Sequence, residues 1–244
     1  MIRLILLVIL GLSFAAAQNE RTPRIVGGRN AGAGEAPYQV SLRPFGSTFH
    51  FCGGALISNR WVLTTAVCVF GRARNSLNVV AGSIALSFGG VARRSSNIIT
   101  HHQFSPGFLE NNLGLIQTGA FPLNQNIWPI AVSSTIFYDE IPATVSGFGA
   151  TGINAGGNSD RLQILFLTTA AYEDPDCIIN LEVNFCTNNG FGEGFCTSDL
   201  GGPLVSNGEL IGIANWNAPC GVGSMDVYVR VSHYRLWIGA IAGV

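Results

Sequence analysis

Short apolar and β-branched runs, separated by Gly, Asn and Pro, make up most of the chain. Runs of this length with turn residues between them predict strands. One set lies near 38–43, 49–57, 61–66, 77–81, 97–100 and 113–116, and a second lies near 143–149, 161–169, 183–187, 203–206, 209–216 and 226–230. Two groups of six short strands with Gly-rich turns predict an all-β fold of two packed six-stranded antiparallel β-barrels.

The end of the chain follows a different pattern. Residues 232–242 place apolar side chains at helical spacing behind Ser232, a residue type that often caps helix N-termini. We therefore expect a C-terminal helix at about 232–242 that packs on the second barrel. With 120–140 as the connection, the first barrel covers about 38–120 and the second about 141–231.

The first residues have the pattern of a secretory signal peptide. Arg3 supplies a positive start, residues 4–14 are apolar, and 15–17 are alanines, so we expect residues 1–17 to be removed. An apolar run of this length is too short to cross a membrane. The polar segment 18–24 is interpreted as a propeptide, and residues 25–244 as the mature domain. The protein is expected to be secreted to the extracellular space.

Six cysteines in a secreted chain predict three disulfides, and spacing alone leaves fifteen connectivities open. No Cys-x-x-Cys pair with a nearby His pair occurs, so we expect neither a metal nor another cofactor. All thirteen basic residues are arginine. From Ile25 onward ten arginines face thirteen acidic residues, a net charge of about −3, and no basic stripe suggests binding to nucleic acid or a membrane.

Segment 196–204 reads Cys-Thr-Ser-Asp-Leu-Gly-Gly-Pro-Leu. It resembles the nucleophile loop of the chymotrypsin/trypsin-like (S1) serine peptidases, usually Cys-x-Gly-Asp-Ser-Gly-Gly-Pro-Leu. Leu200 stands where the nucleophilic serine belongs, and Ser198 stands at an oxyanion-hole position that is glycine in the family. A leucine side chain has no atom that can attack a carbonyl. The resemblance runs from Ile25 to the end of the chain and implies the trypsin-like fold.

The other two triad motifs of the family are altered as well. The histidine motif Trp-Val-Leu-Thr-Ala-Ala-His-Cys corresponds to 61–68 here, with Val67 in the place of the base. The motif Asn-Asp-Ile-Ala-Leu corresponds to 111–115, with Asn112 in the place of the buried aspartate. A buried carboxylate without an imidazole partner is costly, so the neutral Asn112 suits Val67. The resemblance therefore implies a pseudoenzyme with no catalytic residues.

The same resemblance implies disulfide pairs and an activation step. The expected pairs are Cys52–Cys68, Cys177–Cys186 and Cys196–Cys220. A trypsin-like protease would cut this zymogen after Arg24 and free Ile25, the first residue of Ile-Val-Gly-Gly. The new ammonium group would pair with Asp199. In the uncut chain, His50 and Ser41 would hold Asp199 instead.

The pocket residues also follow from the resemblance. Gly194 corresponds to the floor of the specificity pocket and Asp226 to its opposite wall, a combination similar to arthropod collagenolytic (brachyurin-like) members. The wall strand reads Asn215-Trp216-Asn217, with Asn217 in the place of a glycine. A side chain at that position should narrow the mouth of the pocket. Apolar residues at two triad positions should leave an apolar patch beside Trp216.

We interpret the chain as an inactive serine protease homologue that binds a protein or peptide partner: a protease, a protease inhibitor or another component of a protease cascade or digestive fluid. Two alternatives stay open. One is a weak chymotrypsin- or collagenase-like endopeptidase, although His101 and His102 lie by resemblance away from the cleft and His233 is expected at the start of the C-terminal helix. The other is an inert luminal protein that sequesters inhibitors or substrates.

Overall fold

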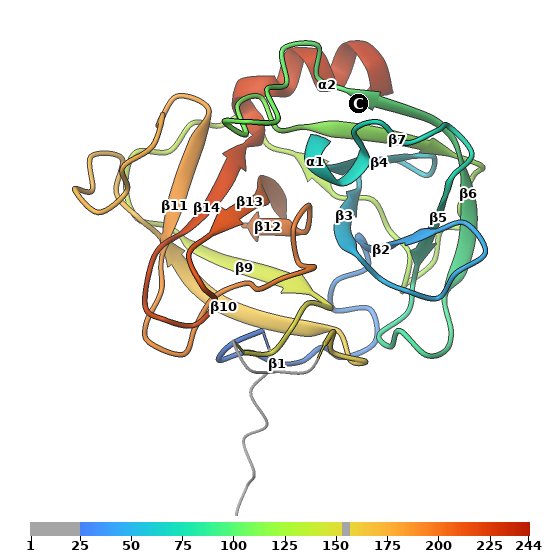
Figure 1. Cartoon of the computed structure of the whole chain (residues 1–244), viewed down its shortest axis with the longest axis horizontal. Coiled ribbons are helices and arrows are strands. Elements are labelled where there is room, and N and C mark those ends of the chain that lie inside the picture. Colours follow the sequence, from blue (N-terminus) through green and yellow to red (C-terminus); the bar gives the residue numbers. More distant parts are fainter. Residues whose placement is uncertain (1–24, 153–156) are drawn as a thin grey trace, which may run out of the picture.

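The computed structural model describes residues 25–152 and 157–244. The expected signal peptide, the expected propeptide and Arg24 lie outside the described residues. Two β-barrels lie side by side in Figure 1, the first on the right and the second on the left, with the C-terminal helix near the top. The predicted fold of two six-stranded antiparallel barrels is confirmed.

The first barrel closes in the order β2-β3-β4-β7-β6-β5, and each neighbouring pair is antiparallel. Its strands are β2 (Gln39–Pro44), β3 (Cys52–Leu56), β4 (Trp61–Thr64), β5 (Leu77–Ala81), β6 (Val91–Thr100) and β7 (Gly114–Thr118). Alternate residues of a strand face one side, so Val40 and Leu42 of β2 reach the same buried cluster as Leu77 of β5. This cluster is the core of the first barrel.

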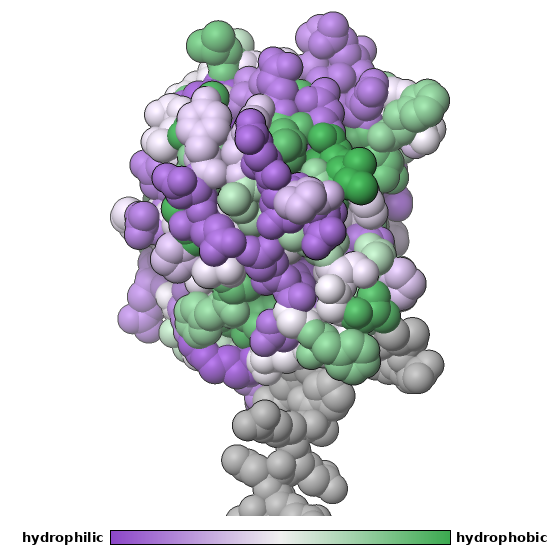
Figure 2. All heavy atoms as spheres, turned by 90° about the vertical axis from the view of Figure 1, so that its left-hand side faces the viewer, coloured by the Kyte–Doolittle hydropathy of each residue, from purple (hydrophilic) through white to green (hydrophobic). Residues whose placement is uncertain are grey.

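The second barrel closes as β9-β10-β11-β14-β13-β12, with β12 returning to β9. Its strands are β9 (Pro142–Gly147), β10 (Gln163–Thr169), β11 (Asn184–Asn188), β12 (Pro203–Ser206), β13 (Glu209–Asn217) and β14 (Asp226–Arg230). Val145, Leu165 and Phe185, from three of these strands, share one buried cluster. Figure 2 shows that hydrophilic side chains cover most of the face on this side of the molecule, broken by separate apolar patches.

Several short elements were not predicted. They are the two-residue strands β1 (Arg29–Asn30), paired with β10, and β8 (Ala131–Val132), parallel to β13, and the four-residue helix α1 (Ala66–Val69). Elements of two to four residues contain only about one hydrophobic period, so no pattern repeats within them. Strand β6 also begins at Val91 rather than near 97, because its first half carries arginines and serines and lies largely at the surface.

The predicted C-terminal helix is confirmed, and its first turn is a 3-10 turn rather than α-helix. A 3-10 turn, η1 (Val231–Tyr234), precedes the helix α2 (Arg235–Ala242), so Ser232 lies within the turn. No side chain caps α2, and its C-cap residue Gly243 adopts a left-handed φ of 71°. Ile238 anchors the helix in a buried cluster that contains Val229 of β14 and also Leu115 of β7. The helix therefore packs against both barrels rather than on the second barrel alone.

The three disulfides that the resemblance implied are confirmed: Cys52–Cys68, Cys177–Cys186 and Cys196–Cys220. The first joins β3 to α1, so it fixes the helix that carries residue 67. The third ties the segment before residue 200 to the loop between β13 and β14.

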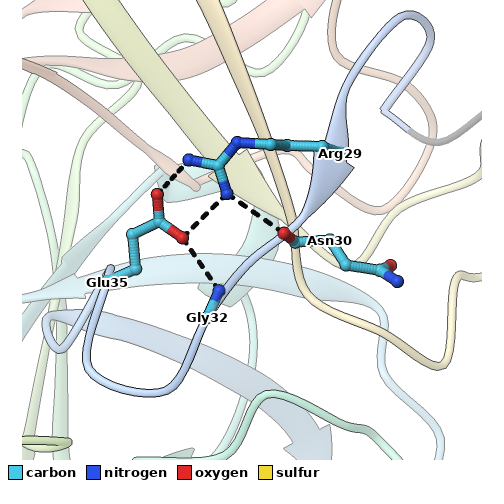
Figure 3. Close-up of polar contacts among 4 residues, drawn as sticks. All are labelled: Arg29, Asn30, Gly32 and Glu35. Carbon is cyan, nitrogen blue, oxygen red and sulfur yellow. Dashed lines mark hydrogen bonds and ion pairs between the residues drawn. The ribbon is translucent and has the colours of Figure 1, made fainter.

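An ion pair fastens the segment that follows Ile25. Arg29 pairs with the Glu35 carboxylate, which also accepts the backbone N–H of Gly32 at 2.8 Å (Figure 3). The hydrogen bond from Arg29 lowers the pKa of Glu35 to about 2, so this carboxylate stays ionised. The ion pair therefore stabilises the turn at 32–35, which directly follows β1. Strand β1 itself pairs with β10 of the second barrel.

Candidate functional site

Leu200 lies at the junction of the two barrels. Its partly buried side chain packs against buried clusters of both barrels. The backbone N–H of Gly53 donates to the Leu200 carbonyl oxygen at 2.8 Å, and the Cys68 Sγ atom lies 3.7 Å from that oxygen. The backbone at position 200 therefore lies between β3 and the Cys52–Cys68 disulfide.

Val67 and Asn112 lie next to each other at this junction. Helix α1 leaves the Val67 side chain 44% exposed. The backbone N–H of Val67 donates to Asn112 Oδ1 at 2.8 Å, and Asn112 is buried just before β7. Because Cys68 of the same helix contacts the Leu200 backbone, the structure brings positions 67, 112 and 200 together.

A chain of side-chain amides extends from Asn112 into the second barrel. Asn112 Nδ2 donates to Asn215 Oδ1 at 2.7 Å, and Asn215 Nδ2 donates to Asn184 Oδ1 at 3.0 Å. Asn112 and Asn215 are both about 1% exposed. Each buried amide therefore donates and accepts a hydrogen bond without any formal charge. Asn184 was missed in the sequence, because 31 residues separate it from Asn215 and no motif marks it.

These three positions offer no acid–base or nucleophilic chemistry. Leucine and valine side chains neither attack a carbonyl nor carry a proton that could be exchanged. The amide of Asn112 is neutral and uses Oδ1 and Nδ2 in the contacts just described. A peptide carbonyl bound here would meet an apolar surface where a serine peptidase places its nucleophile and base.

Three of the histidines lie around the C-terminal segment. The His101 ring lies 5.2 Å from the Tyr234 ring and 5.0 Å from the Trp237 ring, measured between centroids. His102 lies 4.6 Å from His101, and His233 lies 4.8 Å from Tyr234. Burial lowers the pKa of His101, which favours its neutral form. These rings serve the packing of η1 and α2 against the strands.

The fourth histidine, His50, is part of a buried network beside the nucleophile loop. Its Nε2 atom lies 3.0 Å from the Ser198 carbonyl oxygen, and its Nδ1 atom lies 2.9 Å from Ser41 Oγ. Arg43 Nε donates to the same Oγ at 3.0 Å. Burial lowers the pKa of His50 to about 4, so the ring is neutral near pH 7. A carbonyl only accepts, so Nε2 carries the proton and Nδ1 accepts from Ser41.

Ser198 has an unusual backbone conformation. Its φ is 73°, in the left-handed region that side chains with a Cβ atom seldom adopt. The loop has therefore kept a glycine-like backbone although a serine occupies the position. This conformation presents the Ser198 carbonyl oxygen to His50.

Asp199 is buried and held by backbone groups. Its carboxylate accepts the N–H of Gly149 at 2.6 Å and the N–H of Cys196 at 2.9 Å. Burial raises the pKa of Asp199 to about 7, although both hydrogen bonds act in the opposite direction. The structure joins His50 to Ser198 rather than to Asp199. The expected grip of His50 and Ser41 on Asp199 stays a prediction.

The segment that begins at Ile25 lies against the nucleophile loop. Ile25 is fully buried in the cluster that contains Phe195 and that Leu200 packs against. Val26 forms an antiparallel bridge with Gly194, whose N–H donates to the Val26 carbonyl oxygen at 3.1 Å. The expected new N-terminus and the expected pocket floor are therefore neighbours.

The expected pocket residues lie together, and a side chain links the two walls. Asp226 accepts the backbone N–H of Phe195 at 2.7 Å, and a Cβ atom on Gly194 would lie 2.7 Å from the Asp226 carboxylate. Asn217 Nδ2 donates to the Phe195 carbonyl oxygen at 2.6 Å, which ties the wall strand to the opposite segment. Burial raises the pKa of Asp226 to about 7. Trp216 stays 41% exposed at the rim.

Within residues 25–152 and 157–244, no group of three or more His, Cys, Asp or Glu side chains is arranged to hold a metal ion. Over the same part of the chain, no helix is long and apolar enough to cross a membrane.

Known proteins match most of the chain. The trypsin family profile matches residues 25–238. Chymotrypsin-2 of Vespa crabro is 36% identical over 221 residues, which cover 88% of this chain and 98% of the relative. Trypsin of Phaedon cochleariae is 33% identical and covers 95% of both chains. Serine protease SP24D of Anopheles gambiae is 36% identical over 88% of this chain and 80% of its own length.

Proposed function

The chain belongs to the trypsin family of serine peptidases, and we propose that it is a secreted member that acts by binding rather than by hydrolysis. Val67, Asn112 and Leu200 meet at the barrel junction, and none carries a group for attack or proton transfer. This juxtaposition is the observation that carries the proposal.

The amide chain adds a second line of support. A charged aspartate at position 112 would face Asn215 Oδ1, which now accepts from Asn112 Nδ2 at 2.7 Å. Two acceptors at that distance repel each other, and a flip of Asn215 would break its bond to Asn184. The buried surroundings of Asn112 thus favour a neutral amide. A residue outside the triad positions, Asn215, therefore also supports the proposal that no charged aspartate acts at position 112.

A protein or peptide partner fits the remaining cleft surface. Val67 and Trp216 are exposed apolar side chains near the former reaction site. The bond from Asn217 to Phe195 ties the wall strand to the segment before the nucleophile loop, and in this proposal the Asn217 side chain hinders entry of a substrate side chain. The rim is therefore left for binding a partner such as a protease, a protease inhibitor or another cascade component.

Cleavage is part of the proposal. A trypsin-like protease would cut after Arg24 and create an ammonium group on Ile25, whose side chain is already buried beside the nucleophile loop. That ammonium would form a charge-assisted pair with the buried Asp199 carboxylate. Such a pair adds little net stability, but it selects between loop arrangements. Partner binding would then require cleavage.

An active-site titration tests the proposal. Purified protein cut after Arg24 is incubated with a fluorescent organophosphonate and with a peptide ester, alongside an active trypsin at the same concentration. We expect no stoichiometric labelling and no ester turnover above buffer. Labelling in proportion to the protein would favour the weak endopeptidase. Stable capture of a panel of protease inhibitors by both cut and uncut protein would favour the inert sequestering protein.

A further inference from the structure

An open groove lies on the first barrel, formed by residues that the candidate site does not use. Its volume is about 590 Å³. It is lined by the end of β2 at Pro44 and Phe45, by the 72–76 segment before β5, and by Arg94 of β6. The strand order β2-β5-β6 makes these three segments neighbours. Three arginines, Arg72, Arg74 and Arg94, thus border one groove.

Two of these arginines are held in place by their surroundings. Arg94 Nε donates to the Asn75 carbonyl oxygen at 2.7 Å, and its guanidinium carbon lies 3.7 Å from the centre of the Phe45 ring. Arg72 Nε donates to the Cys68 carbonyl oxygen at 2.8 Å, and its guanidinium lies over the Phe51 ring. Both side chains are exposed, so their terminal N–H groups remain open to a ligand.

No carboxylate neutralises the groove within the described residues. In residues 25–152 and 157–244, Arg29 pairs with Glu35, and His233 Nδ1 lies 3.9 Å from a Glu182 carboxylate oxygen. Neither contact involves a groove residue. The charges of the chain are also strongly divided. Residues 25–120 contain seven arginines and two glutamates, a balance of +5, whereas residues 121–244 contain three arginines and eleven acidic residues, a balance of −8. The small net charge of the chain conceals this division.

We propose that the groove binds an acidic peptide segment of a partner protein, one that carries apolar side chains between its carboxylates. Planar guanidinium groups held by their Nε atoms suit bidentate contacts with carboxylates. The ring of Phe45, which lines the groove, is 52% exposed and offers an apolar contact beside the charges. A sulfated glycan provides anionic groups but no apolar side chain for this ring. The observations therefore favour a peptide.

A labelled peptide tests this proposal. The probe is a fluorescein-labelled peptide of Glu-Asp pairs alternating with Phe and Leu, measured by fluorescence anisotropy against the full-length mature protein. Arg74→Glu should weaken binding at least about tenfold, because it reverses a charge at the groove without removing a contact to the protein. Arg94→Lys should also weaken binding, since lysine keeps the charge but loses the planar fork.

Arg161→Glu is the matched control. Arg161 is an exposed arginine over the exposed Phe88 ring, and it lies outside the groove. We expect its Kd to stay within about twofold of the unchanged protein, at an ionic strength near 0.15 M where distant charges are screened. Equal weakening by Arg161→Glu and Arg74→Glu would overturn the proposal, as would undiminished binding of a Gln/Asn version of the peptide.

Two further measurements distinguish peptide binding from the binding of other anions, and the groove from the cleft. If the acidic peptide does not bind but a heparin fragment binds and needs Arg74, the proposal is overturned in favour of a glycan. If an oligonucleotide binds in this way instead, it is overturned in favour of a nucleic acid. A Trp216→Ala variant should leave peptide binding unchanged, because Trp216 is not a groove residue. Peptide binding can therefore fail or succeed independently of any catalytic or cleft-binding result.

Discussion

His50 donates a hydrogen bond from Nε2 to the Ser198 carbonyl oxygen, 3.0 Å away and 148 residues later in the chain. A neutral ring held by Ser41 thereby fixes the backbone of the loop that carries position 200. The histidine is therefore a structural donor in the described arrangement, although its place in the sequence suggested a partner of Asp199.

This contact predicts a pH dependence of stability. The pKa of His50 is about 4 in the folded protein and about 6.5 in an unfolded chain, so the unfolded state binds more protons between these values. Preferential protonation of His50 in the unfolded state should therefore lower the free energy of unfolding by about 3 kcal/mol as the pH falls from 6.5 to 4. The substitution His50→Gln should flatten the pH profile of the free energy of unfolding in this window. His102→Gln, at an exposed ring, is the control, and an unchanged slope in His50→Gln would contradict the prediction.

The left-handed backbone of Ser198 predicts a stabilising substitution. A residue with a Cβ atom pays about 1 kcal/mol for this conformation, and glycine does not. Ser198→Gly should raise the free energy of unfolding by about 1 kcal/mol while keeping the carbonyl that His50 binds. Ser134→Gly, at an exposed serine outside the left-handed region, should instead lower it slightly. Urea unfolding of both variants decides whether the two signs differ.

The amide chain predicts the effect of restoring a charge. Asn112→Asp should destabilise the protein by about 3 kcal/mol above pH 6, because a buried carboxylate would face Asn215 Oδ1 without a cationic partner. Adding Asn215→Ser should recover part of the loss, since a hydroxyl can donate to the carboxylate. Asn124→Asp is the control, because this exposed Asn accepts two backbone N–H groups at Oδ1, which an aspartate keeps. The substitution loses only the exposed 3.3 Å bond from Nδ2 to the Pro122 carbonyl oxygen. Similar losses for Asn112→Asp and Asn124→Asp would refute the explanation.

Restoring catalysis should require the whole set of changes. Leu200→Ser alone should give no measurable ester turnover, because triad residues act as a unit. The combination of Val67→His, Asn112→Asp, Ser198→Gly and Leu200→Ser should give slow turnover and labelling by the organophosphonate.

The matched control for this experiment carries Leu200→Ala in the same background and should remain unlabelled. Turnover by the single Leu200→Ser variant would show that another residue already serves as base. Addition of Asn215→Ser to the combination should increase the rate, since it removes the acceptor that opposes a charge at position 112.

The sequence predicted the barrels because apolar runs are local signals. The disulfide pairs came instead from the resemblance to a known family, since spacing alone left fifteen connectivities open. The sequence did not predict the bond from Asn215 to Asn184 or that from His50 to Ser198, because these pairs meet only after the barrels close. The arginine groove was not predicted for a related reason. Arg74 and Arg94 lie 20 residues apart in the chain and become neighbours only when β5 pairs with β6. The net charge of the chain also sums over both barrels and so hides their opposite charges. A charge count for each predicted barrel would have revealed the division.

Cleavage after Arg24 should abolish the loss of stability that Asp199 causes as the pH rises. In the described arrangement, where Asp199 accepts only the N–H groups of Gly149 and Cys196, its pKa is about 7, above its unfolded value near 3.8. We expect the uncut protein to share this pKa, so its folded state should bind more protons between these values. Asp199 should then lower stability by about 4 kcal/mol as the pH rises from 4 to 7. After cleavage the Ile25 ammonium would favour the ionised carboxylate, and this loss should disappear.

The free energy of unfolding of cut and uncut protein should be compared between pH 4 and 7. Asp226 and His50 titrate in the same window and are present in both forms. Because the Asp199 charge raises the pKa of Asp226, the difference between the two forms reports on both carboxylates, and Asp199→Asn identifies the share of Asp199. We expect the cut form to gain stability relative to the uncut form as the pH rises, and Asp199→Asn to abolish that gain. In hydrogen exchange, amides of 190–200 and 215–223 should gain protection on cutting for the same reason, because the buried pair orders the loop. Identical pH profiles and identical exchange of the two forms would show that Asp199 serves only its backbone donors, Gly149 and Cys196, and that no switch remains.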